Sequence, residues 1–194
     1  SGAIAWRTSF PNVANTGMGD NSPTIDAADN QVIQVSVADA RKADGKASVD
    51  TAVLAVNADT GKIQWKRLLG RGDSPPAYKA SVAMVRNGVI YVSSPSTSHL
   101  SALDAKTGNV LWSSTIPHPS VPGLGRGAVT YRDGLLYQST GAWLYAWDAK
   151  TGKLRHDLYV GGRFGICNPV IVGGTLFVTN SWGWIIAEPL ASVM

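Results

Sequence analysis

The sequence predicts an all-β fold, a β-propeller whose blades each hold four strands, and three observations predict it. A pattern of eleven residues occurs at 55–65, 102–112 and 146–156. The glycine at its seventh position recurs at intervals of 47 and 44 residues, a period typical of propeller blades. The apolar runs between these glycines are short, β-branched and bounded by Gly, Asn and Asp, which is typical of strands and turns rather than helices.

Each repeat unit is expected to contain four strands in a fixed order. A short first strand leads into a second strand that follows Asn, Asp or Gly and is rich in β-branched and aromatic residues. The second strands are expected at 30–36, 87–93, 133–139 and 173–179. After the third strand, the Asp-Ala-Lys-Thr-Gly stretch predicts a tight hairpin to the fourth, because Asp hydrogen-bonds its own backbone and Gly tolerates positive φ.

The whole chain, residues 1–194, is expected to be a single array of such blades. The predicted blades are residues 22–68, 80–115, 126–159 and 167–190. Residues 1–10 are expected to be the closing strand of a preceding blade, since Gly2 and Trp6 keep the spacing of the glycine and tryptophan in the repeat. The last unit is expected to lack its fourth strand.

Two ways of closing the ring stay open, because a propeller must protect the edges of its terminal blades. In the first, the strand around Ile4 completes the last blade and four blades close alone. In the second, which we favour, this chain is half of an eight-bladed ring and the remaining N-terminal half supplies the missing strand. The polar stretch 38–50 predicts a solvated loop between the second and third strands of the first blade.

The composition indicates a folded chain with a modest basic excess. Hydrophobic residues make up 44%, and 17 Lys and Arg against 13 Asp and Glu give a net charge of +4. We expect a small anionic partner, and no nucleic acid because no basic run is present. The single cysteine, Cys167, excludes an internal disulfide, and no apolar stretch is long enough to span a bilayer. The oligomeric state, including a homo-oligomer, stays open.

The repeat Leu-x-Ala-x-Asp-x-x-Thr-Gly-x-x-x-Trp resembles the tryptophan-docking repeat of the PQQ-type β-propellers over essentially the whole chain. The resemblance implies that Trp6, Trp65 and Trp112 wedge between neighbouring blades, and that His156 at the fourth such position weakens its joint. The class includes quinoprotein dehydrogenases, outer-membrane assembly scaffolds and the tetrathionate hydrolases of acidophilic sulfur oxidisers, most of them eight-bladed. It implies an extracytoplasmic location, in the periplasm or associated with the outer membrane.

In such propellers, the connection leading into each first strand lies at one mouth of a central channel. Three of the four connections carry cations, namely Arg71 and Lys79, then Arg126, then Arg163. Converging there, they would bind an anion, because guanidinium groups suit planar oxyanions. The alternative is that they are ordinary surface cations. Asp20 stands in the first connection, where its carboxylate would act as a general acid or base, or else cap a turn.

Three further side chains of these connections are candidates. The Cys167 thiol would attack or hold a sulfur chain, or else is an inert buried residue. His118 would carry protons or bind substrate, or else is an ordinary loop histidine. Tyr78 would form a wall of the ligand site, or else pack in the core. No cluster in the sequence has the spacing of metal ligands.

Among the activities that the resemblance implies, a hydrolase fits the sequence best. A PQQ-dependent dehydrogenase would need a stacking platform for PQQ and oxygen ligands for Ca²⁺, and a scaffold would need an exposed acidic or apolar binding loop. The stretch 17–23 resembles the corresponding stretch of the tetrathionate hydrolases. We therefore expect no cofactor and a hydrolase that converts tetrathionate to thiosulfate, sulfate and sulfur, with Asp20 and Cys167 as catalytic residues.

Overall fold

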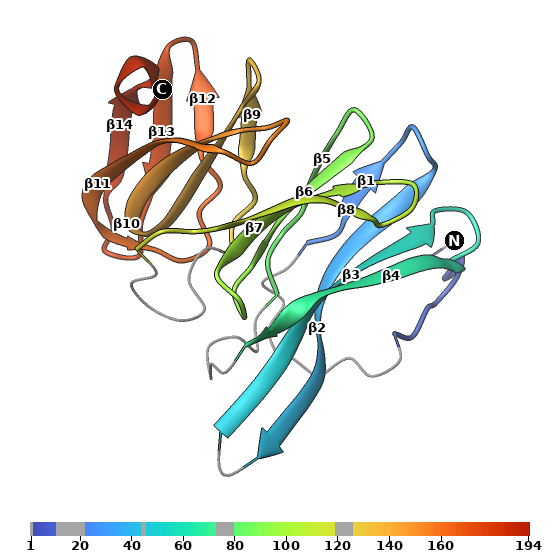
Figure 1. Cartoon of the computed structure of the whole chain (residues 1–194). Coiled ribbons are helices and arrows are strands. Elements are labelled where there is room, and N and C mark those ends of the chain that lie inside the picture. Colours follow the sequence, from blue (N-terminus) through green and yellow to red (C-terminus); the bar gives the residue numbers. More distant parts are fainter. Residues whose placement is uncertain (1, 11–21, 44–45, 73–79, 119–125) are drawn as a thin grey trace.

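Four antiparallel β-sheets follow one another around the molecule and confirm the predicted all-β fold (Figure 1). The computed structural model describes residues 2–10, 22–43, 46–72, 80–118 and 126–194. The first sheet holds β1 (Thr24–Asp26), β2 (Gln31–Ala43), β3 (Lys46–Asn57) and β4 (Ile63–Gly72). The second sheet holds β5 (Met84–Arg86), β6 (Val89–Ser94), β7 (His99–Asp104) and β8 (Val110–Thr115).

The third and fourth sheets continue the same order of strands. The third sheet holds β9 (Thr130–Arg132), β10 (Leu135–Asp148) and β11 (Leu154–Phe164). The fourth sheet holds β12 (Val170–Val172), β13 (Thr175–Thr179) and β14 (Ile185–Pro189), and a short 3-10 helix, η2 (Leu190–Val193), follows it. No helix in the described part of the chain is long and apolar enough to cross a membrane.

Strand β10 is a hairpin that supplies two strands of the third sheet. The fourteen residues of a straight strand would span about 46 Å. However, the residues flanking β10 meet, because the backbone N–H of Ala149 donates to the carbonyl of Gly134 at 2.9 Å. Gly141, in the middle of β10, has a φ of 63°, which allows the chain to turn back there. The third sheet therefore matches the four-stranded plan of the first two.

The prediction of a loop at 38–50 was wrong. The cross-strand pairs of β2 and β3 continue through this stretch as far as Ala43 and Lys46. The hairpin projects beyond the other sheets at the bottom of Figure 1. The pair Asp44-Gly45 stands between the last partners, and Asp-Gly is among the strongest sequence signals for a two-residue hairpin turn. This dipeptide favours a hairpin, whereas the polar composition of the stretch suggested a loop.

Three apolar cores lie between successive sheets. The first core joins Val35 and Val53 of the first sheet to Ile90 of the second. The second joins Leu100 of the second sheet to residues of the third, and the third joins the third sheet to Leu176 of the fourth. Each sheet with neighbours on both sides therefore buries both of its faces, which is why a blade is stable only within the array.

A tryptophan at the outer strand of one sheet docks on the next sheet. The indole N–H of Trp65 donates to the carbonyl of Ala105 at 3.0 Å, and that of Trp112 donates to the next such alanine at 3.1 Å. Trp6 makes the same bond to the first sheet at 2.9 Å. A Cβ placed on Gly108 would lie 2.5 Å from Cε3 of Trp65, so the indole rests directly on the glycine.

The joint between the third and fourth sheets is built differently. His156 of β11 pairs with the sheet as Trp112 of β8 does, so it holds the docking position without an indole. Leu190 of the fourth sheet is equivalent to Ala149 of the third. In each case the backbone N–H donates to the carbonyl of the glycine just before the second strand of its sheet. Leu190 and Val193 of η2 are buried in the third core. Apolar packing by η2 thus replaces the docked indole.

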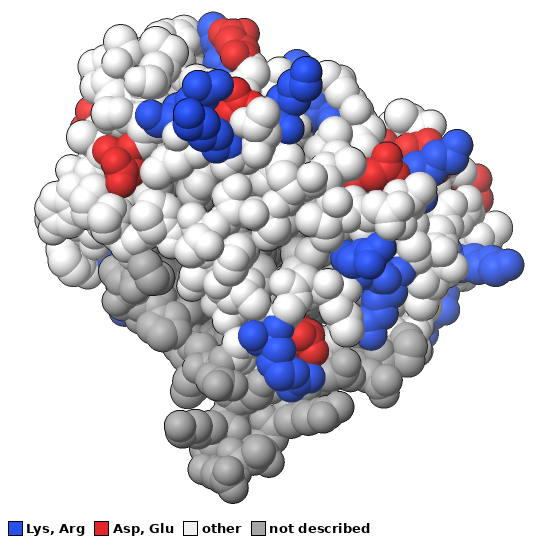
Figure 2. Space-filling model, in the orientation of Figure 1, with Lys and Arg blue, Asp and Glu red and all other residues white. Residues whose placement is uncertain are grey.

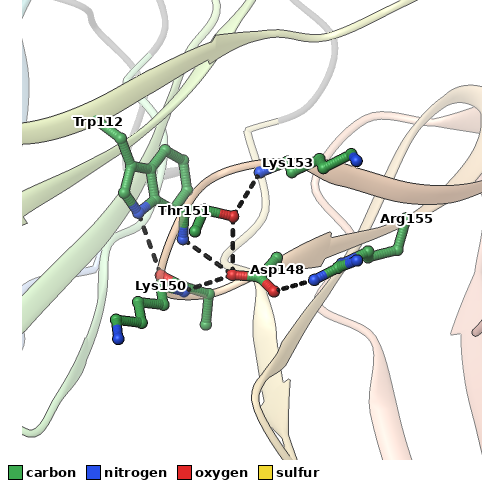
Figure 3. Close-up of polar contacts among 7 residues, drawn as sticks. Trp112, Asp148, Lys150, Thr151, Lys153 and Arg155 are labelled. Carbon is green, nitrogen blue, oxygen red and sulfur yellow. Dashed lines mark hydrogen bonds and ion pairs between the residues drawn. The ribbon is translucent and has the colours of Figure 1, made fainter.

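The repeated turn before each docking glycine is closed by a carboxylate or amide oxygen. In the third sheet, Oδ1 of Asp148 accepts hydrogen bonds from the backbone N–H of Lys150 and from the backbone N–H and hydroxyl of Thr151 (Figure 3). Arg155 donates to the other oxygen, Oδ2, at 2.5 Å. These donors, the Arg155 guanidinium first, lower the pKa of Asp148 to about 2. The turn is therefore formed best with this carboxylate ionised.

Replacing Gly108 with alanine is expected to lower the free energy of unfolding by about 2 to 4 kcal/mol, from positive φ together with displacement of the Trp65 indole. Urea denaturation measures the loss. The matched control is Gly88→Ala, because Gly88 has a similar φ of 73° and no atom within 4 Å of an added Cβ. The control should lose only about 1 to 2 kcal/mol. Equal losses in the two variants would contradict the docking role.

The stabilisation that Asp148 provides is expected to depend on pH. Its pKa is lower in the folded chain, about 2, than the ordinary value of 3.8. Its contribution is therefore complete above about pH 4 and is lost as the pH falls towards 2. Asp148→Asn should remove part of the fall in urea midpoint across that range. Asp104→Asn is the control and should remove less, because the pKa of Asp104 is lowered chiefly by Thr107, without an arginine. An unchanged pH profile in Asp148→Asn would exclude this role.

Candidate functional site

The segments that enter the first strands of three successive sheets are hydrogen-bonded to one another. The backbone N–H of Val82, before β5, donates to the carbonyl of Arg126 at 2.9 Å. The N–H of Arg126, before β9, donates to the carbonyl of Gly165 at 3.0 Å, before β12. These bonds bring the ends of the three connections together. The side chains beside these bonds are therefore candidates for a shared site.

Two of the predicted site residues line a single cleft between the third and fourth sheets. The cleft has a volume of about 220 Å³, and Arg126 and Cys167 both line it. The other lining residues are Gly165, Ile166, Thr179, Asn180 and Ser181. Arg126 is 8% exposed and Cys167 is 7% exposed, so both are largely buried although they line an open cleft. The structure thus joins a cation and a thiol that are 41 residues apart in the sequence.

The position of Cys167 is fixed by its neighbours. The backbone N–H of Thr179 donates to Cys167 Sγ at 3.3 Å. The hydroxyl of Ser139 donates to the Cys167 carbonyl at 3.3 Å. On the same side, a Cβ on Gly127 would lie 1.9 Å from that carbonyl oxygen, so only glycine fits at 127. The thiol is therefore held in one place on the cleft wall.

Asn180 is a cleft residue that sequence reasoning missed. Its Oδ1 accepts hydrogen bonds from the backbone N–H groups of Trp182, at 2.9 Å, and Trp184, at 3.2 Å, which closes the turn between β13 and β14. Its Nδ2 is buried and has no acceptor among the residues that the structure describes. The stretch Asn180-Ser-Trp-Gly has turn-forming composition, and this was the feature of the sequence that indicated a turn at Asn180.

Arg71 and His118 lie away from this cleft. Arg71 lies in β4 rather than in the connection that follows, and its Nη2 is 2.8 Å from Oδ2 of Asp50, its cross-strand partner. His118 stacks on Trp143 with a centroid separation of 4.1 Å, and its Nε2 lies 3.0 Å from Oδ2 of Asp157 on the outer strand β11. His118 therefore contacts the outer strand of the third sheet, whereas Arg71 contacts β3 of the first sheet.

The remaining predicted site residues fall into two groups. Arg163 has an exposed side chain at the end of β11, and its carbonyl accepts a bond from the N–H of Ser181 at 2.9 Å, beside the cleft. Asp20, Tyr78 and Lys79 lie outside the described residues. Their assignment as catalytic and substrate-binding residues stays a prediction.

Charge is not gathered into one basic surface on the face shown in Figure 2. The Lys and Arg side chains there stand in separate groups, several of them beside Asp or Glu. Within the described ranges, no three His, Cys, Asp or Glu side chains gather closely enough to hold a metal ion. The cleft is distinguished by its composition instead, since Arg126 lines it and none of the lining residues that the structure describes is acidic.

Comparisons with known proteins match the chain along its whole length. The family model described as outer membrane protein assembly factor BamB matches residues 1–121 and 96–187. A tetrathionate hydrolase from Acidithiobacillus ferrooxidans is 41% identical over 193 residues, which are 100% of this chain and 38% of that protein. A tetrathionate hydrolase from Acidianus ambivalens is 38% identical over 200 residues, covering 100% of this chain and 37% of that protein.

A solved structure supports the fold in the same way. The crystal structure of BamB from Moraxella catarrhalis superposes with a TM-score of 0.59 at 16% identity, over 94% of this chain and 63% of that one. At that identity the likeness concerns the fold alone. The chain spans less than two fifths of the length of the two hydrolases that it matches.

Replacing Arg71 with glutamine is expected to lower the free energy of unfolding by about 1 to 3 kcal/mol, because the Asp50 carboxylate, in a residue only 7% exposed, loses a charge-assisted bond. The double variant Arg71→Gln/Asp50→Asn should recover part of the loss, since a neutral amide costs less to bury. Urea denaturation of the wild-type protein, the two single variants and the double variant gives the coupling free energy between Arg71 and Asp50. Unchanged stability in Arg71→Gln would contradict this structural role.

Proposed function

Because this chain belongs to the PQQ-type repeat family whose model is described as outer membrane protein assembly factor BamB, we propose that it forms part of the channel of a propeller hydrolase. The substrate is an anionic sulfur compound, and we take it to be tetrathionate. One observation carries this proposal, the 41% identity to a tetrathionate hydrolase along the entire chain. The structural similarity to BamB, at 16% identity, supports the fold and gives no information about activity.

The proposed reaction uses water and needs no oxidant. One tetrathionate and one water give one thiosulfate, one sulfate, one sulfur atom and two protons, so atoms and charge balance. The substrate carries a sulfonate at each end, and charge-assisted hydrogen bonds from arginine suit such groups. Arg126, in the cleft, and Arg163, beside it, would hold one end. Lys79 would serve the other, while Arg71, paired with Asp50, contributes chiefly to stability.

In this proposal, Asp20 carries the proton transfer. A carboxylate that follows two glycines, Gly17 and Gly19, would approach a bound substrate closely, and would protonate the departing sulfur group or activate water. Cys167 would contact the sulfur chain from the cleft wall. Few side chains of the chain are charged, 15% in all, which suits a protein that works in acid, where ion pairs of carboxylates are lost.

We further propose that the rest of a longer, extracytoplasmic protein completes the ring. Within the described residues the fourth sheet has three strands, so the outer edge of β14 has no partner strand. Val170, Val172 and Ile185 on this sheet are 55%, 64% and 76% exposed. Burying such a face and edge is what a neighbouring blade does elsewhere in the array. The curated relatives are long enough to supply further blades.

Replacing Asp20 with asparagine is expected to lower the rate of tetrathionate hydrolysis at acid pH by at least about 100-fold, since proton transfer by a positioned side chain contributes that much. The complete protein is incubated with tetrathionate, and thiosulfate and sulfate are measured. Asp133→Asn is the control, because Asp133 is exposed on the turn between β9 and β10. Undiminished turnover in Asp20→Asn would contradict the assigned role.

The same preparation separates the hydrolase from the two other activities of the class. A quinone absorbance in the purified protein, with oxidation of an alcohol in place of hydrolysis, would identify a dehydrogenase. Absence of both reactions together with stable association with an outer-membrane partner would identify a scaffold. Formation of thiosulfate and sulfate in equal amounts identifies the hydrolase.

A further inference from the structure

A groove between the second and third sheets combines aromatic walls with positive charge. It has a volume of about 310 Å³, and Tyr91, Trp112 and Tyr131 are its aromatic residues. Arg86 and Lys150 are the charged residues among the described ones that line it. The ring centroids of Tyr91 and Trp112 are 6.0 Å apart, and Cζ of Arg86 lies 4.2 Å from the Tyr131 ring centroid. We call this the Arg86 groove.

Neither cation of the Arg86 groove is paired with a carboxylate among the residues that the structure describes. Arg86 is exposed and lies over the Tyr131 ring, and this contact leaves its N–H groups able to donate in the plane of the guanidinium. Lys150 is also exposed, and Figure 3 shows its side chain leaving the turn on the side of Trp112, away from Asp148. Both oxygens of Asp148 are engaged, one by the turn and one by Arg155. The groove therefore attracts anions.

The equivalent turn of the third sheet shows how this charge arises. Arg132 ends β9 as Arg86 ends β5, and each is paired with the first residue of the strand that follows. Arg132 is neutralised by the next residue, Asp133, at 2.9 Å, whereas the residue after Arg86 is the neutral Asn87. Asn87 and Asp133 have the same φ of 50°, so the two turns match in backbone conformation. One side chain thus decides whether the arginine has a carboxylate beside it.

The Tyr91 hydroxyl adds a second, independent indication of a ligand. Tyr91 is 6% exposed, and its hydroxyl has no hydrogen-bond partner within the described part of the chain. Burial first, and then Tyr131, raise the pKa of Tyr91, while Arg86 acts in the opposite direction, so the hydroxyl stays protonated and can donate. Tyr131 and Arg86 line the same groove, which places this hydroxyl on its side. Buried hydroxyls normally have a partner, and a bound acceptor would supply one here.

We propose that the Arg86 groove binds a small, flat aromatic anion, a carboxylate or sulfonate carried on one or two rings. The anionic group accepts hydrogen bonds from the Arg86 guanidinium and the Tyr91 hydroxyl. The rings pack against Trp112 and against Leu111, which is 55% exposed and lines the groove. The volume is at the lower end of the range for small-molecule sites, about 300 to 1,000 Å³, which suits a ligand of this size. The site goes beyond the hydrolase proposal and does not depend on it.

Isothermal titration calorimetry of the complete protein with naphthalene-2-sulfonate tests the site. 2-Naphthol, which has the rings without the charge, and methanesulfonate, which has the charge without the rings, are the matched controls. We expect saturable binding of naphthalene-2-sulfonate and at least about tenfold weaker binding of each control, because each lacks one of the two components. No binding at millimolar concentrations, or equal affinity for either control, overturns the proposal.

Two variants assign the binding to the Arg86 groove. Arg86→Gln removes the cation, whereas Asn87→Asp keeps it and gives it the carboxylate neighbour that Arg132 has in Asp133. Each should weaken binding of naphthalene-2-sulfonate at least about tenfold. Arg132→Gln is the matched control and should bind as the wild type does. Unchanged affinity in either groove variant contradicts the proposal. Circular dichroism and the urea midpoint show whether each variant is folded, and Asn87→Asp is expected to fold because Asp133 adopts the same φ.

Acetylation of lysines locates the bound probe. Lys150 lines the groove, whereas Lys153 is exposed on the same hairpin and is not among the lining residues. Saturating naphthalene-2-sulfonate should slow acetylation of Lys150, measured by mass spectrometry, and leave Lys153 unchanged as the control within the same sample. Equal rates at Lys150 with and without the probe place it elsewhere and overturn the assignment.

Discussion

The contact of a tryptophan with a glycine of the next sheet is the constraint on which the rest of the structure depends. A single sheet of this chain has two apolar faces and cannot bury either of them alone. The indole of Trp65 both fills the space above Gly108 and donates a hydrogen bond to the Ala105 carbonyl. One side chain therefore fixes the separation and the register of two sheets. The same contact recurs at Trp6 and Trp112, so neighbouring sheets meet at similar geometry.

This repeated contact also determines where the candidate site lies. Docking at the outer strands brings the inner ends of successive sheets together, and backbone bonds from Val82 and Arg126 then join the segments that lead into the first strands. Residues that pack the repeat cannot vary freely, whereas these segments differ from one unit to the next. The cleft of Arg126 and Cys167 lies between the third and fourth sheets, the pair in which η2 replaces the docked indole. The candidate site thus lies where the repeat is least regular.

The fold could be predicted from the sequence because its determinants are local. The hairpin of β2 and β3 shows the limit of that approach, since the polar stretch 38–50 suggested a loop whereas cross-strand pairing continues to Ala43 and Lys46. The candidate site could be predicted only in part, because a connection runs from the outer strand of one sheet to the inner strand of the next. His118, early in its connection, therefore contacts β11 at the outer part of the sheet, and Arg126, late in the same connection, reaches the cleft. Sequence alone does not say how far along that path a residue lies.

The sequence by itself determined the all-β class, the succession of blades and the docking turns, because strand patterning, Asx turns and glycines with positive φ are properties of short segments. It also indicated that the connections contain cations, because the residue types of a segment are known from the sequence before its position in space is known. Only the tertiary structure decided which of them meet. Arg126, Cys167 and Asn180 come from three separate segments, and packing of the third sheet against the fourth brings them to one cleft. Arg71 lies in β4 opposite Asp50, a pairing between strands that no local pattern specifies.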